Sequence, residues 1–316
     1  MYPKVTLCVL SYNTGKYAEL AIRSAISCGY PNLEIVCVDD CSTDDSADIL
    51  TKLSKSIPFR FFRNENNLGI PGACNRGLSF STGEYFIVLG DDLLLPNRIW
   101  GDVEILERHP DVGLVCGMAK AIGPDGLELE KYAKWQNSQK EGLFQEAPES
   151  VWLRGSRIFT PTVTYRTRVL RDAGGWETFF DFEDRPMFMR LAQDGIKGWH
   201  RSEVTTLYRR HGKNFSGSFR VGMLKQELEL KRRFGLSIPS WKVTSKLLIE
   251  VHYWMLFLKT SSSEARESLS LADLSRWNWT LESRALKLTF LCLTFLRPNR
   301  LATRGIRQYL FPRRGI

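Results

Sequence analysis

Two adjacent carboxylates, Asp91 and Asp92, stand where a short apolar segment of the sequence ends. The segment, Tyr85 to Leu89, combines aromatic and β-branched residues and predicts a buried strand. A carboxylate just beyond the carboxyl end of a buried strand lies in the crevice where α/β sheets hold ligands. Two acidic side chains there favour a hard cation, Mg²⁺ or Mn²⁺, bridging a diphosphate. The alternative is a polar turn in which Asp92 caps the following helix.

Two further predicted strands also end in polar loops. Residues 5–10 form an apolar segment that leads into Ser11-Tyr-Asn-Thr-Gly15, which has the composition of a turn. Residues 33–38 form a second apolar segment and lead into the acidic loop 39–44. Because the carboxyl ends of parallel strands meet at one edge of a sheet, we expect these loops and the loop 90–95 to converge.

The elements that must position these loops alternate along the chain. Strands alternating with helices of about ten to fifteen residues predict right-handed βαβ units and a mostly parallel, doubly wound α/β sheet. Ser42 with Asp45 has the spacing of a capping box, and Pro96 can open a helix. Residues 123–150 lack clear periodicity and predict a long excursion around a substrate. The predicted strands are 5–10, 33–38, 59–63, 85–89, 112–116, 159–165 and 205–210, and the clearest predicted helices are 17–27, 96–108 and 182–195.

The composition is that of a soluble globular protein, with 43% hydrophobic and 25% charged residues. With 316 residues, the chain can hold one large domain and an appendage. We expect a domain over residues 1–222 and a basic helical region over residues 223–316. No secretory signal precedes the first strand pattern, and the seven cysteines include no CxxC pair. These features favour reduced core cysteines in a cytosolic protein.

Positive charge is concentrated in the last third of the sequence. Residues 201–316 contain 22 Lys and Arg but only 8 Asp and Glu, whereas the net charge of the whole chain is +9. Such a region favours a polyanion or an anionic membrane surface as a partner, unless it is simply a solvated basic face. No recognised nucleic-acid-binding module is present, so nucleic acid is not an expected partner.

Two apolar segments lie in the same region, at residues 247–258 and 285–296. Neither reaches the roughly 20 apolar residues that a spanning helix needs. Six arginines follow the second segment with no acidic residue among them, and each could contribute about 1 kcal/mol at an anionic surface. We therefore expect a peripheral protein on the inner, cytoplasmic face of the cell membrane. The alternative is that both segments are helices packed on the main domain.

Seven groups of residues between Val5 and about Ser218 occur in a characteristic order. They are Val9-Leu-Ser-Tyr-Asn13, Val38-Asp-Asp-Cys-Ser-Thr-Asp44, Asn67-Leu-Gly69 with Ala73-Cys-Asn75, Gly83-Glu-Tyr-Phe-Ile-Val-Leu-Gly-Asp-Asp92, Gly174-Gly-Trp176, Glu183-Asp184 with Arg190-Leu191, and Tyr208-Arg-Arg-His211. Together they resemble the family 2 inverting glycosyltransferases of the GT-A fold, of the bacterial polysaccharide type. The resemblance covers two thirds of the chain.

The resemblance implies a UDP-sugar donor and residues that bind it. Asp40 would accept a hydrogen bond from N3–H of the uracil. Tyr12 would pack on the base with Asn13 near it, and Asn75 would belong to the same donor site.

The resemblance also implies a metal and a catalytic base. Asp91 matches the second acidic residue of the family's Asp-x-Asp element, which binds Mn²⁺ or Mg²⁺. Asp92 and His211 are the other candidate ligands, because Leu89 stands at the first acidic position of that element. Asp184 matches the general base that deprotonates the acceptor hydroxyl.

The expected reaction moves a sugar from UDP to a hydroxyl of a glycan acceptor, with inversion at the anomeric carbon. Related enzymes often extend glycans carried on a polyprenyl diphosphate lipid. In-line displacement requires a base on the acceptor side and charge neutralisation at the departing diphosphate.

Two other functions stay open. A nucleotidyltransferase would have a phosphate loop rich in glycine and basic residues after the first strand, whereas residues 11–16 contain one Gly and one Lys. A glycan-binding or scaffold subunit could keep the fold without the chemistry, and Leu89 is the residue that favours this alternative.

Overall fold

The computed structural model describes residues 1–129, 140–148, 150–151, 156, 158–212, 214, 226, 229–230 and 233–234. The chain divides into two compact units, Met1–Gln226 and Glu227–Ile316, and the fold given below is that of the first. The predicted boundary between residues 222 and 223 and the apolar segments 247–258 and 285–296 lie outside the described residues. Within the part of the chain that is described, no helix combines the length and apolar character needed to cross a membrane.

Strands and helices alternate through the first half of this unit, as predicted. The elements are β1 (Val5–Ser11), α1 (Gly15–Ser27), β2 (Leu33–Asp39), α2 (Ser46–Ser54), β3 (Arg60–Arg63), α3 (Gly69–Phe80), β4 (Tyr85–Leu89), β5 (Leu93–Leu94), α4 (Arg98–Arg108), β6 (Val112–Ile122), β7 (Gly142–Gln145), a 3₁₀ turn η2 (Thr160–Thr162), β8 (Val163–Arg166), α6 (Thr167–Asp172), α7 (Asp184–Gln193) and β9 (Lys197–Arg209).

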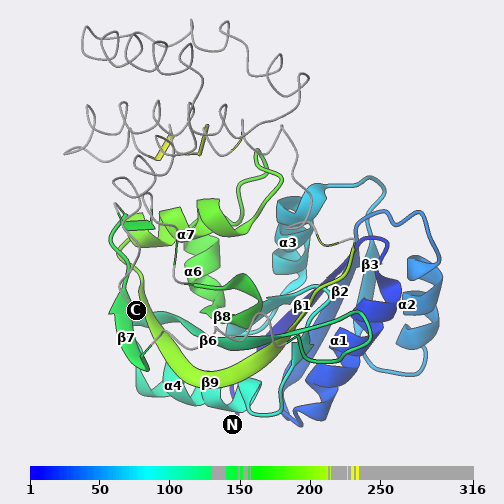
Figure 1. Ribbon diagram of the computed structural model, residues 1–316, viewed down its shortest axis with the longest axis horizontal. Coiled ribbons are helices and arrows are strands. Elements are labelled where there is room, and N and C mark those ends of the chain that lie inside the picture. The colour runs from blue at the N-terminus through cyan, green and yellow to red at the C-terminus, as the bar shows by residue number, and fades with distance from the viewer. Residues whose placement is uncertain are drawn as a thin grey trace, which may run out of the picture. The chain divides into compact units, whose positions relative to one another are not determined.

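The described strands form one nine-stranded sheet in the order β3-β2-β1-β4-β8-β6-β9-β5, with β7 also paired to β9 (Figure 1). β1 lies between β2 and β4 and is parallel to both, and β2 is parallel to β3. β8 runs antiparallel between β4 and β6, and β6 is again parallel to β9. The predicted mostly parallel, doubly wound α/β sheet is confirmed.

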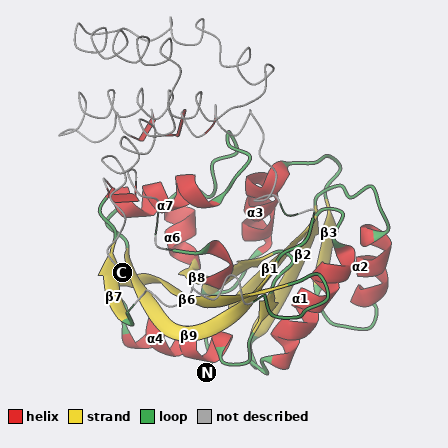
Figure 2. Ribbon diagram, in the orientation of Figure 1, coloured by secondary structure: helices red, strands yellow, loops and turns green. Residues whose placement is uncertain are grey.

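Helices cover both faces of this sheet (Figure 2). On one face, apolar side chains of α1, α2 and α4 pack on inward-facing residues of β1, β2 and β4. On the other face, α3 approaches β1 so closely that a Cβ atom on Gly77 would lie 2.1 Å from Sγ of Cys8. The core of the first face includes Leu7, Val9, Ala18, Ile22, Ile35, Leu50, Ile87, Leu89, Ile99 and Leu106. All ten of these side chains are buried, so the carboxyl ends of β1, β2 and β4 are held rigidly.

The two predicted helix starts are wrong. α4 begins at Arg98 rather than Pro96, because Leu93 and Leu94 form β5 against β9 before the chain turns. Ser42 does not cap α2, since its hydroxyl donates to Oδ1 of Asp39 instead. α2 begins at Ser46.

Two strands are much longer than predicted. β6 continues to Ile122 and β9 begins at Lys197, and the two pair over most of their length. Part of the predicted excursion 123–150 is also ordered into the sheet, because Gly142–Gln145 forms β7 against β9. The six described cysteines are free thiols, and five of them are buried, in agreement with the prediction of reduced core residues.

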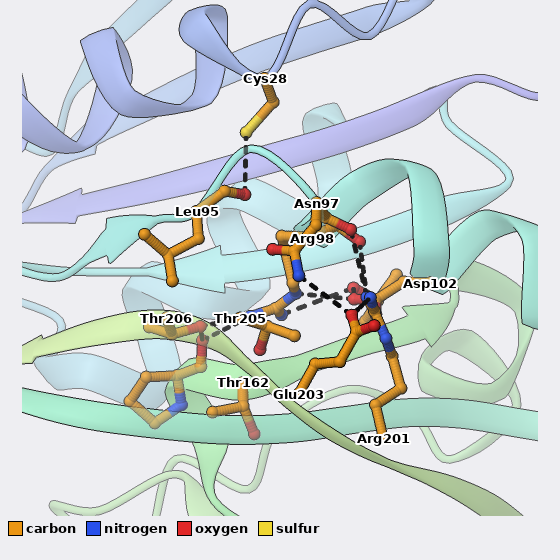
Figure 3. Close-up of polar contacts among 12 residues, drawn as sticks. Cys28, Leu95, Asn97, Arg98, Asp102, Thr162, Arg201, Glu203, Thr205 and Thr206 are labelled. Carbon is orange, nitrogen blue, oxygen red and sulfur yellow. Dashed lines mark hydrogen bonds and ion pairs between the residues drawn. The ribbon is translucent and has the colours of Figure 1, made fainter.

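A network of buried charges fastens α4 to β9 (Figure 3). Asp102 receives Nε of Arg98 at 2.6 Å on one oxygen and Nη1 of Arg201 at 2.8 Å on the other. Arg98 also donates to Oγ1 of Thr206 at 2.6 Å, and Arg201 pairs with Glu203. The side chains of Arg98 and Asp102 are fully buried, so each charge depends on these partners.

Candidate functional site

The loops after β1 and β2 are joined through Asn13. Its side-chain Oδ1 accepts the backbone N–H of Thr43 at 2.8 Å, and its own N–H donates to Oγ of Ser42 at 2.9 Å. Asn13 has a positive φ of 57°, a conformation that asparagine tolerates better than most residues. The predicted convergence of loops 11–15 and 39–44 is therefore confirmed. Tyr12, beside this junction, is 49% exposed and could pack against a flat ligand.

The two aspartates that end β2 have different surroundings. Asp39 is fully buried and binds the N–H and hydroxyl of Ser42, so it holds the loop together. Asp40 accepts two hydrogen bonds on Oδ1, from Nδ2 of Asn64 and from the N–H of Leu68, both at 2.8 Å. No described residue donates to Oδ2 of Asp40, so this oxygen can still accept a hydrogen bond from a ligand.

A second cluster lies at the carboxyl end of β4. Nε2 of His211 is 2.8 Å from Oδ2 of Asp91, and the imidazole stacks on the ring of Tyr17 with centroids 4.9 Å apart. The side chain of His211 is 5% exposed and that of Asp91 is 20% exposed. The structure thus brings together two of the three residues predicted to bind a metal.

Asp92 makes a different contact. Its Oδ1 accepts the backbone N–H of Arg209 at 2.8 Å, which ties the end of β4 to the end of β9. Burial, together with the charge of Asp91, raises the pKa of Asp92 to about 7. The alternative role as a helix cap is wrong, because Asn97 occupies the N-cap of α4. The role of Asp92 as a metal ligand stays a prediction.

Arg209 fixes the loops around the second cluster. Its Nε donates to the carbonyl oxygen of Asp91 at 3.0 Å, and its Nη1 donates to the carbonyl oxygen of Gly123 at 3.2 Å. The guanidinium also lies over the ring of Tyr17, 4.9 Å from its centroid. Neither Arg209 nor Tyr17 was predicted as a site residue from the sequence. The one indication of Arg209 in the sequence was its position two residues before His211.

The donor set of the second cluster fits a divalent cation bound jointly with a substrate. Among the described residues, no group of three His, Cys, Asp or Glu side chains could hold a metal alone. Mg²⁺ and similar ions are usually bound by one or two carboxylates together with phosphate oxygens of the substrate. The carboxylate of Asp91 and the imidazole of His211 can supply the protein's share of such a site.

Two more acidic residues stand at the start of α7. Asp184 is the first residue of the helix, and its Oδ1 accepts the N–H of Arg185 at 2.7 Å. Glu183 precedes it, and burial followed by the charge of Asp184 raises the pKa of the Glu183 carboxyl above its ordinary value. Negative charge at a helix start is stabilised by the free N–H groups there, so this position suits a carboxylate.

Asn75 joins α3 to the turn before α7. Its Nδ2 donates to the carbonyl oxygen of Trp176 and its Oδ1 accepts the N–H of Trp176, both at 2.7 Å. Gly175 has a φ of 78°, and a Cβ atom there would lie 2.4 Å from Oδ1 of Asn75. The amide of Asn75 is thus engaged within the chain, and its role in donor binding stays a prediction.

Comparison with known proteins assigns this architecture to a family. Glycosyl transferase family 2 matches residues 6–172, more than half of the chain. The Escherichia coli UDP-Glc:alpha-D-GlcNAc-diphosphoundecaprenol beta-1,3-glucosyltransferase WfaP is 26% identical over 233 residues, which cover 72% of this chain and 85% of that protein.

Solved structures with the same fold include two glycosyltransferases. Residues 1–349 of Staphylococcus aureus TarS, in complex with UDP-GlcNAc, give a TM-score of 0.62 at 19% identity, covering 87% of this chain and 78% of that one. The mannosyltransferase PcManGT from Pyrobaculum calidifontis, in complex with GDP-Man and Mn²⁺, gives a TM-score of 0.58 at 18% identity, covering 98% of this chain and 85% of that one. The chain belongs to glycosyl transferase family 2 and has the GT-A fold.

Proposed function

We propose that the protein transfers a sugar from a UDP-sugar to a hydroxyl of a glycan acceptor, with inversion, during synthesis of a bacterial cell-surface polysaccharide. The observation that carries the proposal is the placement of Asp40 and Asp91. They follow β2 and β4, the two neighbours of β1, so both lie at the same edge of the sheet. A nucleoside diphosphate lying across the end of β1 can present its base to one residue and its phosphates to the other.

The base end of the donor would be bound by Asp40, Tyr12 and Asn13. Oδ2 of Asp40 would accept N3–H of the uracil, and the exposed ring of Tyr12 would pack on the base. Asn13 would act by shaping the loop, since its side chain already binds the backbone of Thr43. The name of the relative WfaP includes UDP-Glc, which supports a uridine nucleotide. The fold itself is found with both kinds of donor, UDP-GlcNAc in TarS and GDP-Man in PcManGT.

The phosphate end would be bound with Mn²⁺ or Mg²⁺ at Asp91 and His211. When bound, the metal would act as a Lewis acid that neutralises charge on the departing diphosphate. The PcManGT complex contains Mn²⁺, which supports use of a divalent cation by a protein of this fold. Arg209 would keep Asp91 in place through its hydrogen bond to the Asp91 carbonyl oxygen.

Asp184 would serve as the general base. As the acceptor hydroxyl attacks the anomeric carbon, its proton would pass to the Asp184 carboxylate while the bond to the diphosphate breaks. A positioned base of this kind contributes roughly 10²- to 10⁴-fold to the rate. Inversion follows because the hydroxyl enters on the face opposite to the leaving diphosphate.

The acceptor would be lipid-linked. The name of WfaP includes a diphosphoundecaprenol-bound sugar, which supports a substrate held at the membrane surface. The arginines after residue 296 would hold the protein at the cytoplasmic face of that membrane. Co-sedimentation of the full chain with anionic vesicles at low salt tests this, and unchanged binding after deletion of residues 285–316 would contradict it.

UDP release by the purified chain tests the proposed reaction. The chain is incubated with Mn²⁺, a UDP-sugar and a panel of lipid-linked glycans, with and without acceptor. Asp184→Asn keeps the shape of the side chain but cannot take a proton, so donor binding is expected to survive while kcat falls. If the UDP-sugar binds but no UDP is formed with any acceptor, the result would instead support a glycan-binding subunit. An unchanged kcat in Asp184→Asn would move the base to Glu183.

A further inference from the structure

The loop after β3 holds the carboxylate of Asp40 in one orientation. Nδ2 of Asn64 and the N–H of Leu68 both donate to Oδ1 at 2.8 Å. Asp40 is 5% exposed and Asn64 is 6% exposed, so water competes little for these bonds. Two donors on one oxygen fix the rotation of the carboxylate about its Cβ–Cγ bond.

Asn64 is itself anchored to the sheet. Its backbone N–H donates to the carbonyl oxygen of Asp39 at 2.8 Å, directly after the pairing of Asp39 with Arg63 at the end of β3. The amide group is therefore placed by the same strands that place Asp40. Asn64 was not among the residues predicted from sequence, because only the pairing of β2 with β3 brings it to Asp40.

This arrangement leaves Asp40 with one usable oxygen. A carboxylate oxygen has two lone pairs, and at Oδ1 both are taken by Asn64 and Leu68. Among the described residues no donor contacts Oδ2. Uracil has a single N–H donor, at N3, which one oxygen satisfies. Guanine has two adjacent donors, N1–H and the N2 amino group, which pair best with both oxygens of a carboxylate.

We propose that Asn64 is a specificity-determining residue, which by saturating Oδ1 of Asp40 selects a nucleobase with one N–H donor, uracil, over guanine. The inference rests on the proposed role of Asp40 as the residue that binds the base of the donor. Cytosine is excluded separately, because its N3 is an acceptor and would face Oδ2 of Asp40 without a proton between them.

Calorimetric titration of the full chain with UDP, GDP and CDP in the presence of Mn²⁺ tests this. In Asn64→Ala one lone pair of Oδ1 becomes available, so UDP binds less tightly and GDP gains a hydrogen bond. The preference for UDP over GDP is expected to fall on the order of 10-fold. CDP binding is expected to stay weak in every variant, because N3 of cytosine carries no proton and no change in the protein can supply one.

Three further variants complete the experiment. Asn64→Ser has a side chain too short to reach Oδ1 but remains polar, so it provides the same test if Asn64→Ala does not fold. Asn66→Ala changes an exposed residue of the same loop and is expected to behave as wild type. Asp40→Ala removes the group that binds the base and is expected to weaken UDP binding and abolish discrimination among the three nucleotides.

The outcomes separate the inference from the proposed function. A reduced preference for UDP in both Asn64 variants, with Asn66→Ala unchanged, supports the inference. An unchanged preference in both Asn64 variants, together with weakened UDP binding in Asp40→Ala, overturns the inference and leaves the proposed function standing. A wild-type protein without preference for UDP, or an Asp40→Ala variant that binds UDP normally, overturns the proposed function and the inference with it.

Discussion

Nε2 of His211 lies 2.8 Å from Oδ2 of Asp91, although 120 residues separate the two in the sequence. Asp91 follows β4 and His211 follows β9, and Arg209 joins the two strand ends through its backbone and its side chain. The carboxylate–imidazole pair is thus produced by the sheet and not by a local motif. A cation held there would be bound by groups from both halves of the fold.

Replacement of either member of this pair is expected to impair metal binding. Asp91→Asn should remove most of the transferase activity. His211→Ala should weaken the apparent affinity for Mn²⁺ by at least about 10- to 100-fold, because the loss of a group that only supports a metal ligand already costs that much. Titration of activity with Mn²⁺ measures both, with His109→Ala, whose ring stacks on Trp199, as a matched histidine control. Full activity of the wild type in excess EDTA would rule out a metal requirement.

Stability is expected to depend on pH through Asp92. Burial raises the pKa of this carboxyl from 3.8 to about 7, so between these values the folded protein holds a proton that the unfolded chain has released. The free energy of unfolding contributed by Asp92 is fully present below the lower value and is lost as the pH rises through the higher one. Asp92→Asn can still accept the N–H of Arg209 but does not titrate.

Urea denaturation across this pH range, in metal-free buffer, measures the effect. The wild type is expected to lose stability as the pH rises, while Asp92→Asn should show a flatter dependence. Equal slopes in the two proteins would mean that Asp92 is ionised throughout and that another group accounts for the pH dependence.

The turn before α7 offers a matched pair of glycines. Gly174 and Gly175 have nearly equal φ angles of 80° and 78°, but only at Gly175 would a Cβ atom approach Oδ1 of Asn75. Gly174→Ala is expected to cost about 1 to 2 kcal/mol of unfolding free energy through backbone conformation alone. Gly175→Ala should cost more, because it also disturbs the two hydrogen bonds between Asn75 and Trp176. Equal losses in chemical denaturation would show that the Asn75 contact contributes little.

Among substitutions in α4, those in the buried charge network with β9 are expected to lower the free energy of unfolding most. Arg98→Met leaves Asp102 with one of its two arginines and should lower the unfolding free energy by about 3 to 5 kcal/mol. Arg108→Met, on the same helix, breaks an exposed ion pair with Glu104 and should change stability little. Urea denaturation of the two variants measures the difference. A small loss of unfolding free energy in Arg98→Met would indicate that Arg201 alone is enough to pair with the buried charge of Asp102.

Local sequence patterns were sufficient to predict much of the fold. The apolar segments ending at Leu10, Val38 and Leu89 predicted β1, β2 and β4, and the parallel arrangement of these strands placed Asp40 and Asp91 at one edge. These features depend on short stretches of chain, in which burial and turn composition leave a clear periodicity.

The features that the sequence did not predict depend on contacts between distant segments. The partner of Asp92 is a backbone N–H more than a hundred residues away, so the sequence could not exclude a helix cap. The extent of β9 was underestimated because charged residues such as Arg201 interrupt its apolar pattern. Arg201 can be buried because distant groups, Asp102 among them, pair with it. Asn64 was missed for the same reason, since only the register of β2 against β3 gives it a function.

The order of the strands has a consequence for synthesis of the protein on the ribosome. β1, β2, β3 and β4 pair with one another and are translated early, so the half of the site that contains Asp40 can form while the chain is still growing. The pairing of β6 with β9 must wait until β9 is made about 80 residues later, and long-range pairing of this kind is slow. His211 follows β9, so a nascent chain would acquire the loops around Asp40 before the pair formed by Asp91 and His211. Under the proposed function, nucleotide would therefore meet a half-built site first, and the site would be complete only when β9 has been released and docked.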